Sequence, residues 1–412
     1  MKQEFDLRLE ERQKKGKRWL TFFMIATLFS ILALATLLLS IINNAFGYVA
    51  LENKKNPEEL GIEGKTLEQL SEEELISILK ENLSRRYFIK LDTEKPFTER
   101  STKELRIIID EEVINPTVRR TWTLAESLFQ SSTIHQWMKE KLPGGYLVFR
   151  SWLNIDLVMR SQEALAIHSG VRGAIIGSFL TILIAILFAF PIGIGAAIYL
   201  EEYATDTALN RFIQLNIYNL AGVPSIIYGM LGLAVFVRYL EPVTSGALFG
   251  VLTDNTVANG RTILSAGLTL GLLILPTIII NAQEAFKAVP NSLRHSSLSV
   301  GATTWQTIWH HVLPVSIDRI LTGTVLAISR AIGETAPLVV VGASAFLTQD
   351  PSGIFSKFTT LPIVIYQWTS RPQIEWKNAA AAAIIVLLIL LLSLNATAII
   401  LRNKYRKEKR LA

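Results

Sequence analysis

The chain has 412 residues, of which 50% are apolar and only 18% are Asp, Glu, Lys or Arg. Soluble domains usually carry about 25% charged residues, so the composition argues against an ordinary cytosolic enzyme. The formal charge of +6 comes from 41 basic and 35 acidic residues, concentrated between and outside long apolar stretches. The chain contains no cysteine, which excludes disulfides and thiolate sites.

Six apolar stretches are long enough to cross a membrane, since about 20 helical residues span the hydrocarbon core of a bilayer. The pattern predicts an all-α polytopic membrane protein with transmembrane helices at residues 19–42, 173–200, 212–237, 262–283, 320–346 and 378–401. The first stretch follows basic residues, as in a signal peptide. No small-residue cleavage site comes after it, so a retained helix is favoured.

Basic residues at both ends of the chain predict its orientation. Residues 1–18 hold seven Lys or Arg against four acidic residues, and the tail 402–412 holds six against one. Short flanks rich in Lys and Arg stay in the cytoplasm, so both termini are expected there, which an even number of spans permits. This places residues 43–172 and 238–261 outside and residues 284–319 inside.

The outside segment 43–172 has the size of a domain. Its patterns predict a helix from a Thr66–Gln69 capping box, a short strand within 104–114 and a second helix over 123–142. We expect a small α-rich domain packed over the membrane core. A membrane-anchored enzyme or sensor with its active domain here is an alternative, although no catalytic motif stands out and its two histidines are too scattered for a metal centre.

The inside loop 284–319 is the most informative cytoplasmic segment. Its proline and glycine positions predict a short helix after Pro290, a turn at Gly301, a second helix from Thr304 and the end of that helix near Pro314. An apolar stripe is expected at Trp305, Ile308, Trp309 and Val312. The loop is either an interfacial helix under the bilayer or a knob that inserts into the groove of a partner protein.

This loop resembles the cytoplasmic loop of import permeases in the ABC-transporter superfamily. That loop carries Glu-Ala-Ala, a Gly four residues later and Leu-Pro twelve residues beyond the Gly, and Gly301 and Leu313-Pro314 match the spacing. The resemblance implies that the loop couples the permease to an ATPase subunit. The implied contact positions are His295, Ser296 and Ser297, which replace Glu-Ala-Ala, and also Trp305.

Four segments narrow the resemblance to the permeases of phosphate importers: residues 170–178, 191–203, 222–229 and 329–338. Within the last, Thr335-Ala336-Pro337 resembles the PstA member rather than its PstC partner. The resemblance implies a six-helix type I importer permease in the bacterial inner membrane. Its implied partners are a second permease, two ATP-binding subunits and an extracytoplasmic phosphate-binding protein, with no enzyme activity and no cofactor or metal in this chain.

Arg330 and Glu334 are the only charges inside any predicted span. A charge at the bilayer centre costs at least about 2.5–3.5 kcal/mol, so such residues usually face an interior or an aqueous path. At i,i+4 they share a helix face and can pair. We expect Arg330 to lie on an anion path, because guanidinium matches phosphate oxygens, with Glu334 weakening its hold and Thr335 adding a hydroxyl. A structural ion pair is the alternative.

Proline and glycine predict where the helices open. Pro337 has no N–H, so the carbonyl of Gly333 loses its helical partner, and Pro224 interrupts the third span in the same way. Non-helical backbone at membrane depth is tolerated only against protein or a water-filled cavity. We therefore expect gating kinks at Gly333–Pro337 and at Pro224.

The predicted function is a permease subunit of an ATP-driven phosphate importer, which performs no chemistry itself. The chain has no nucleotide-binding motif, so ATP energy is expected to arrive through the 284–319 loop. Sulfate or another oxyanion remains a possible substrate, and a PstC-type identity remains open. A proton-coupled secondary transporter with Glu334 as proton carrier is the alternative from another class.

Overall fold

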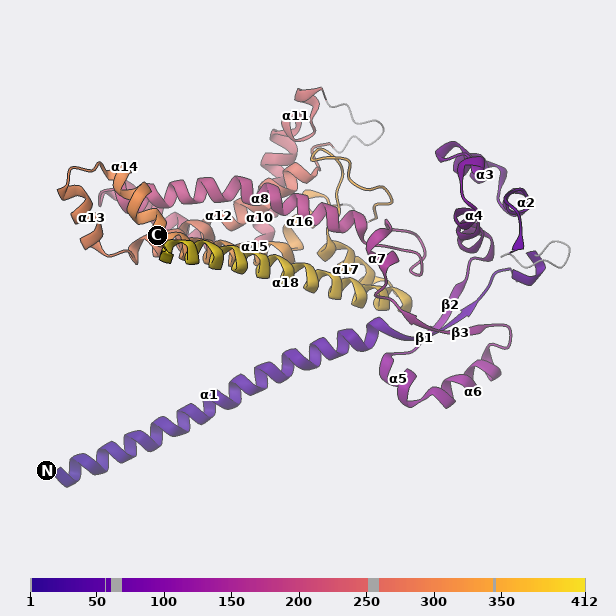
Figure 1. The fold of residues 1–412 in the computed structure, drawn as a ribbon, viewed down its shortest axis with the longest axis horizontal. Helices are drawn as coiled ribbons and strands as arrows, with labels where there is room; N and C mark the ends of the chain where they lie inside the picture. Colours follow the sequence, from indigo (N-terminus) through magenta and orange to yellow (C-terminus); the bar gives the residue numbers. More distant parts are fainter. Residues whose placement is uncertain (1, 56, 61–68, 251–258, 344–345, 412) are drawn as a thin grey trace. The chain divides into compact units, whose positions relative to one another are not determined.

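A computed structural model describes residues 2–55, 57–60, 69–250, 259–343 and 346–411. The chain divides into two compact units, Met1–Leu153 and Asn154–Ala412 (Figure 1). The division falls inside the segment 43–172 that we expected to form one outer domain, and the first long helix belongs to the first unit.

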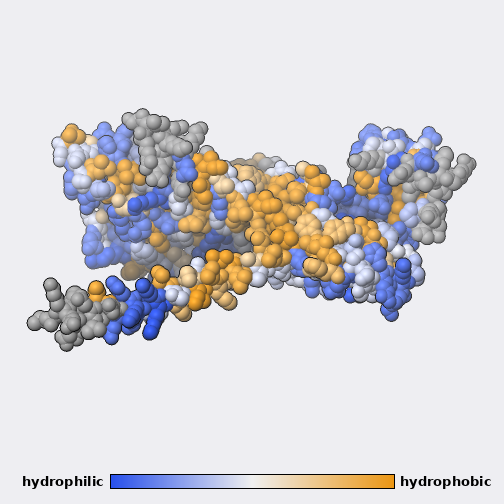
Figure 2. Space-filling model, turned by 60° about the horizontal axis from the view of Figure 1, so that its bottom comes forward, coloured by the Kyte–Doolittle hydropathy of each residue, from blue (hydrophilic) through white to orange (hydrophobic). Residues whose placement is uncertain are grey.

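The first unit begins with one long helix, α1 (Lys2–Ala45). Its part Glu11–Ala45 is long and apolar enough to cross a membrane, and its most apolar window is 0% buried. Figure 2 shows apolar residues along this helix and hydrophilic residues on its N-terminal side. A helix that exposes apolar side chains on every side is suited to a lipid environment.

A three-stranded antiparallel sheet follows directly from α1. Its central strand is β1 (Phe46–Glu52), which lies between β2 (Thr117–Thr121) and β3 (Tyr146–Ser151). Val49 pairs with Thr121 on one side and with Val148 on the other. The chain is therefore not all-α as predicted. The strands are short and pair over long sequence separations, so local periodicity did not indicate them.

A helical lobe connects β1 to β2, with elements η1 (Pro57–Leu60), α2 (Glu72–Asn82), α3 (Arg85–Glu94), η3 (Phe97–Glu99), α4 (Thr102–Ile108) and the π-helical η4 (Ile109–Ile114). Helix α2 begins after Ser71, whose capping box includes Glu74; the predicted start at Thr66 lies outside the described residues. The strand predicted within 104–114 is wrong. A Ser101–Glu104 capping box starts α4. The buried residues Leu105, Ile109 and Val113, spaced four apart, lie on one face of α4 and η4.

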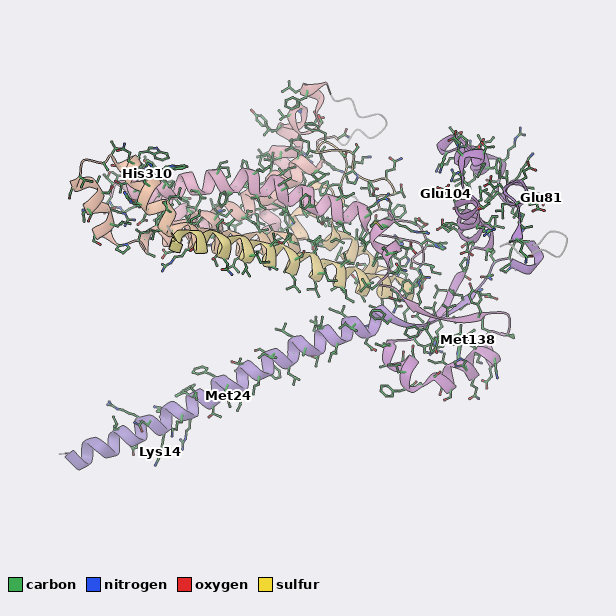
Figure 3. The ribbon with its side chains drawn as sticks, viewed as in Figure 1. Lys14, Met24, Glu81, Glu104, Met138 and His310 are labelled. Atoms are coloured by element: carbon green, nitrogen blue, oxygen red, sulfur yellow. The ribbon has the colours of Figure 1, made fainter. Side chains whose placement is uncertain are left out.

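The helix predicted over 123–142 is divided in two. Helix α5 (Leu124–Phe129) and helix α6 (Ser131–Lys141) meet at Gln130, which lacks helical geometry. Both pack against the sheet, where Ala50, Trp122, Ile134 and Met138 form a small core. Figure 3 shows Met138 on α6, below the strands.

Four long helices lie side by side in the second unit: α8 (Arg172–Ile198), α12 (Ile263–Lys287), α15 (Leu313–Gly333) and α18 (Ile374–Leu411) (Figure 1). Helix α12 is the central one, with 67% of its apolar window buried. Gly267 and Gly271 face α8 so closely that a Cβ atom would lie 2.6 Å from Ile184 and 2.7 Å from Phe188. Small residues allow membrane helices to approach in this way.

Shorter elements connect the four helices. They are α7 (Ile155–Met159), η5 (Tyr199–Tyr203), α9 (Ala208–Ala221), α10 (Ser225–Gly232), η6 (Leu233–Tyr239), α11 (Glu241–Thr244), η7 (Ala247–Phe249), α13 (Asn291–Ser299), α14 (Thr304–Thr307), η8 (Ile308–Val312), α16 (Ala336–Val341) and α17 (Leu361–Ser370). Helix α17, which the sequence analysis did not predict, has a buried apolar face.

Among the described residues, five helices are long and apolar enough to cross a membrane, or six if a bent pair counts as one span. Two predicted spans need correction. The third is not continuous, because Ala208–Ala221 and Ser225–Tyr239 meet at an angle of 106°. The fifth, predicted at 320–346, is a helix over Thr304–Gly333, because its start is not stopped by Pro314 and it ends before Pro337.

Candidate functional site

The first part of the candidate site is the break between α9 and α10. Helix α9 ends at Ala221, and α10 starts after Pro224, whose backbone is not helical. Because a proline disfavours helical geometry in the residue before it, the break lies where Pro224 predicts it. The hydroxyl of Tyr228 donates to the carbonyl of Leu220 at 2.8 Å, so this carbonyl, which also accepts from the N–H of Val223, is bonded across the break.

The second part is the break between α15 and α16. Helix α15 ends at Gly333, Glu334 is extended, and α16 begins at Ala336 with Pro337 in its first turn. Proline suits the first turn of a helix, where its missing N–H has no partner to lose. Arg330 therefore lies in the last turn of α15, directly before the opening that was predicted at Gly333–Pro337.

The two breaks lie next to each other. Helix α10 packs against α16, and a Cβ atom at Gly229 would lie 2.6 Å from the Cα of Pro337. Two interrupted helices thus bring opened backbone and one guanidinium to the same place.

Arg330 and Glu334 form a loose ion pair. A single contact joins Arg330 Nε to Glu334 Oε1 at 3.4 Å, and the side chains are 55% and 19% exposed. Thr335 is half-buried beside them, and Gly333 is exposed, with no atom within 4 Å of a Cβ built there. Within the described part of the chain, the Arg330 guanidinium makes this one contact, and more than half of the side chain is exposed.

Arg330 belongs to an exposed stripe along α15. Residues three or four apart share one helix face, and the exposed members on this face are Arg319, Thr322, Leu326, Arg330 and Gly333. Arginine side chains are costly to place against lipid. The stripe is therefore suited to a water-filled path or to the surface of another subunit.

The predicted coupling loop contains the turn at Gly301. Helix α13 ends there with Gly301 at φ +87°, and the N–H groups of Gly301 and Ala302 donate to the carbonyls of Leu298 and Ser297. This is the Schellman arrangement, in which glycine supplies the left-handed residue. A Cβ atom at Gly301 would meet nothing within 4 Å, so its conformation, and not crowding, requires glycine.

The predicted stop at Pro314 is wrong. The chain from Thr304 to Gly333 is one continuous helix, with a wider π-helical turn at Ile308–Val312 just before Leu313 and Pro314. The N–H of Leu313 donates to the carbonyl of Ile308, five residues back. A π-turn changes which carbonyls are paired, so the helix continues through a proline that cannot donate. Leu313 and Pro314 are half-buried within it.

Some of the loop residues predicted to contact a partner are exposed, and one is buried. His295, Ser296 and Trp305 are exposed, and His310, labelled in Figure 3, is exposed near them. Ser297 is instead buried, and its hydroxyl contacts that of Thr307 at 2.9 Å. Ser297 therefore joins α13 to α14 and is not available to a partner.

The predicted apolar stripe is also divided. Trp305 and Trp309 stack with ring centroids 5.7 Å apart and are each more than half exposed. Ile308 and Val312 are 0% exposed and face the bundle. The loop thus presents two stacked indoles outward while the other two positions hold it against the core.

Sequence reasoning missed an ion pair between Arg294 on α13 and Glu202 in η5. Arg294 Nη2 lies 2.6 Å and Nε 3.0 Å from the two carboxylate oxygens, and the side chains are only 17% and 7% exposed. Arg294 also donates to the carbonyls of Phe286 and Val289. The acidic end of the second span and the lone arginine of α13 were visible in the sequence, but nothing in it paired them.

Known proteins resemble the second unit. Residues 189–407 match the family described as binding-protein-dependent transport system inner membrane component. The phosphate transport system permease protein PstC of Haemophilus influenzae is 33% identical over 250 residues, 59% of this chain and 76% of the relative. PstA of the same organism is 32% identical over 232 residues, 55% and 74% of the two chains. The near-equal identities do not separate a PstA type from a PstC type.

A further relative is the probable ABC transporter permease protein YqgI of Bacillus subtilis, which is 28% identical over 242 residues, 56% of this chain and 76% of the relative. The family match lies entirely in the second unit and includes both helix breaks and the loop 284–319. Members are membrane components of transport systems and not enzymes. This chain belongs to the family of binding-protein-dependent transport system inner membrane components.

Proposed function

We propose that the chain is a permease subunit of an ATP-driven importer of inorganic phosphate, with both termini in the cytoplasm. A second permease would complete the translocation path, two ATPase subunits would drive it, and an extracytoplasmic binding protein would deliver the anion. Relatives named as phosphate transport permeases of both kinds support the substrate. Sulfate or another oxyanion offers similar oxygens and is the second candidate.

The loose Arg330–Glu334 pair at the break between α15 and α16 carries this proposal. A permanently strong pair would occupy the guanidinium, whereas a single 3.4 Å contact leaves donors for a passing anion. Guanidinium binds phosphate oxygens through parallel hydrogen bonds. Competition from Glu334 would keep that binding weak enough for release, which transport requires.

The loop 284–319 would receive the movement of an ATPase subunit. Its exposed surface combines His295, Ser296 and the stacked Trp305 and Trp309, which suits insertion into a groove of a partner. The Gly301 turn sets the angle between α13 and α14. The half-buried Leu313 and Pro314 lie where this loop continues into α15, the helix that carries Arg330.

Purification of the chain with its partners and reconstitution into vesicles test the proposal. We expect ATP-dependent uptake of labelled phosphate, and we expect Arg330→Gln to reduce it by at least about tenfold, because a hydrogen bond to a charged group contributes about 1.5–3 kcal/mol. Arg211→Gln is the matched control, because Arg211 is an exposed arginine on α9 with a 3.4 Å surface pair. The control should transport normally.

Each rival predicts a different result. Uptake that survives ATP depletion and collapses with the proton gradient would favour a secondary transporter. Transport of sulfate in preference to phosphate would change the substrate, and Arg330→Gln with unchanged uptake would assign the pair a structural role only. Single cysteines introduced into this cysteine-free chain and labelled from one side would test the orientation of the termini.

A further inference from the structure

The ion pair between Arg294 and Glu202 is the most extensively bonded charged group near the coupling loop. Arg294 Nη1 donates to the carbonyl of Val289 at 2.7 Å and to Asn291 Oδ1 at 3.2 Å. Its Nη2 donates to the carbonyl of Phe286 at 2.9 Å and to Glu202 at 2.6 Å, and Nε faces the same carboxylate. Each guanidinium nitrogen is therefore used.

These bonds connect three elements at one point. Arg294 lies on α13, Phe286 lies in the last turn of α12, and Glu202 lies in η5, which continues α8. Leu293, the neighbour of Arg294, packs into the core that Phe286 and Val289 form. The side of α13 that faces the bundle is thus fixed to the ends of two long helices.

These contacts connect the ATPase-facing loop to the long helices of the bundle. Helix α12 packs against both α8 and α15, and α15 carries Arg330 in its last turn. A displacement of α13 would move the ends of α8 and α12 with it, because charge-assisted bonds in a buried site resist separation. Such rigid-body movement of packed helices is a common route for conformational change.

We propose that Arg294 and Glu202 are positioning residues that form a coupling clamp, which transmits movement of the ATPase-facing loop to α8 and α12. The clamp rests on the proposed function, since it needs an ATPase on the loop. It does not contact the anion. Its role is to keep α13 and the bundle moving as one body.

The ratio of ATP hydrolysed to phosphate transported, measured in vesicles holding the complete transporter, tests the clamp. We expect Arg294→Gln and Glu202→Gln to assemble with the ATPase but to raise this ratio by about tenfold, the scale of a typical coupling between sites. The exchange variant Arg294→Glu with Glu202→Arg should recover part of the coupling. Lys95→Gln is the control, because its 3.0 Å pair with Glu104 is exposed and lies in the first unit, outside the coupling loop.

The possible outcomes separate the clamp from the proposed function. Absence of ATP-dependent phosphate uptake in the unmodified transporter would contradict the proposed function. A coupled unmodified transporter with unchanged ratios in both single variants would overturn the clamp. Loss of assembly in the single variants that the exchange variant does not repair would also overturn it, because the pair would then serve folding alone.

A second, independent observation concerns the first unit, where helix α5 lies beside the C-terminal end of α1 (Figure 1). The N–H of Ala125 donates to Asn43 Oδ1 at 2.8 Å, and the N–H of Tyr48 donates to Ser127 Oγ at 2.9 Å. At the end of α5, Leu128 and Phe129 are 66% and 86% exposed. Two large apolar side chains are thus fixed near the end of a membrane-length helix.

We infer that Leu128 and Phe129 form an apolar foot that inserts into the lipid leaflet at the C-terminal end of α1. Asn43 follows the last apolar residues of α1 and so marks the boundary of the hydrocarbon layer. Phe129 is only one helical turn, about 6 Å, beyond Ala125. Apolar side chains at that depth lie at the boundary between headgroups and acyl chains, where amphipathic segments bury them. Because Glu11–Ala45 of α1 is long and apolar enough to cross a membrane, lipid around this helix would extend to the foot.

A fluorophore on Phe129→Cys is attached at one site, because the chain has no other cysteine. In vesicles containing nitroxide-labelled lipids we expect its emission to be quenched. The same label on Glu81→Cys, exposed on α2 (Figure 3), should not be quenched. Equal, weak quenching at both positions would overturn the foot, and so would shielding of position 129 that appears only when the binding protein is added.

Discussion

Two arginine–glutamate pairs among the described residues of the second unit differ in sequence separation, bonding and exposure. Arg330–Glu334 is formed by residues four apart, is joined by one contact of 3.4 Å and leaves the arginine 55% exposed. Arg294–Glu202 joins residues 92 positions apart through several bonds, with both side chains largely buried. Under the proposed function the same two residue types serve opposite needs: the exposed pair exchanges partners with the anion, and the buried pair stays closed.

Energetics explain the difference. An exposed i,i+4 pair contributes about 0.3–0.5 kcal/mol, so an anion competes with it easily. Breaking a buried pair by removing one partner costs about 3–5 kcal/mol, because a charge remains buried without compensation.

Glu202→Ala should lower the free energy of unfolding by about 3–5 kcal/mol, since Arg294 would keep a buried charge without its counterion. Denaturant unfolding of the purified chain in detergent measures this. Glu334→Ala is the comparison variant and should change the same quantity by less than about 0.5 kcal/mol. Equal losses for the two variants would remove the contrast between the pairs.

Gly301→Val should cost about 1–2 kcal/mol locally, because a residue with a Cβ atom is forced into the left-handed conformation. Neither ion pair is touched, so this variant separates the loop from the clamp. We expect transport per ATP to fall while the overall unfolding transition shifts little. The control is Ala302→Val, next to the turn. A Gly301 variant with normal coupling would mean that the turn geometry is not needed.

Glu334→Gln should have the smallest effect. If Glu334 competes with the anion for Arg330, its neutralisation should tighten phosphate binding to the purified transporter by about twofold, the equivalent of about 0.3–0.5 kcal/mol. Release, measured as chase of bound labelled phosphate, should slow by a similar factor. Weaker binding in this variant would show that Glu334 orients Arg330 and does not compete with it.

Several features were predictable from local sequence. Proline at 224 and 337 located both helix breaks, and Gly301 located the turn, because their backbone restrictions act within a few residues. The helix end predicted at Pro314 was wrong, because the π-turn at Ile308–Val312 changes the hydrogen-bond pairing and allows the helix to continue through a residue without an N–H. The three-stranded sheet was missed because each strand is short and its partners are distant in the chain.

Local sequence patterns predicted a membrane transport subunit and located its apolar stretches. They also singled out Arg330 and Glu334, the two charges near Pro337. Only the tertiary structure decided that the two helix breaks meet at Gly229 and Pro337, that Ser297 faces inward and that Arg294 binds Glu202. Hydropathy and proline act locally, whereas these contacts depend on how α8, α10, α12 and α16 pack together.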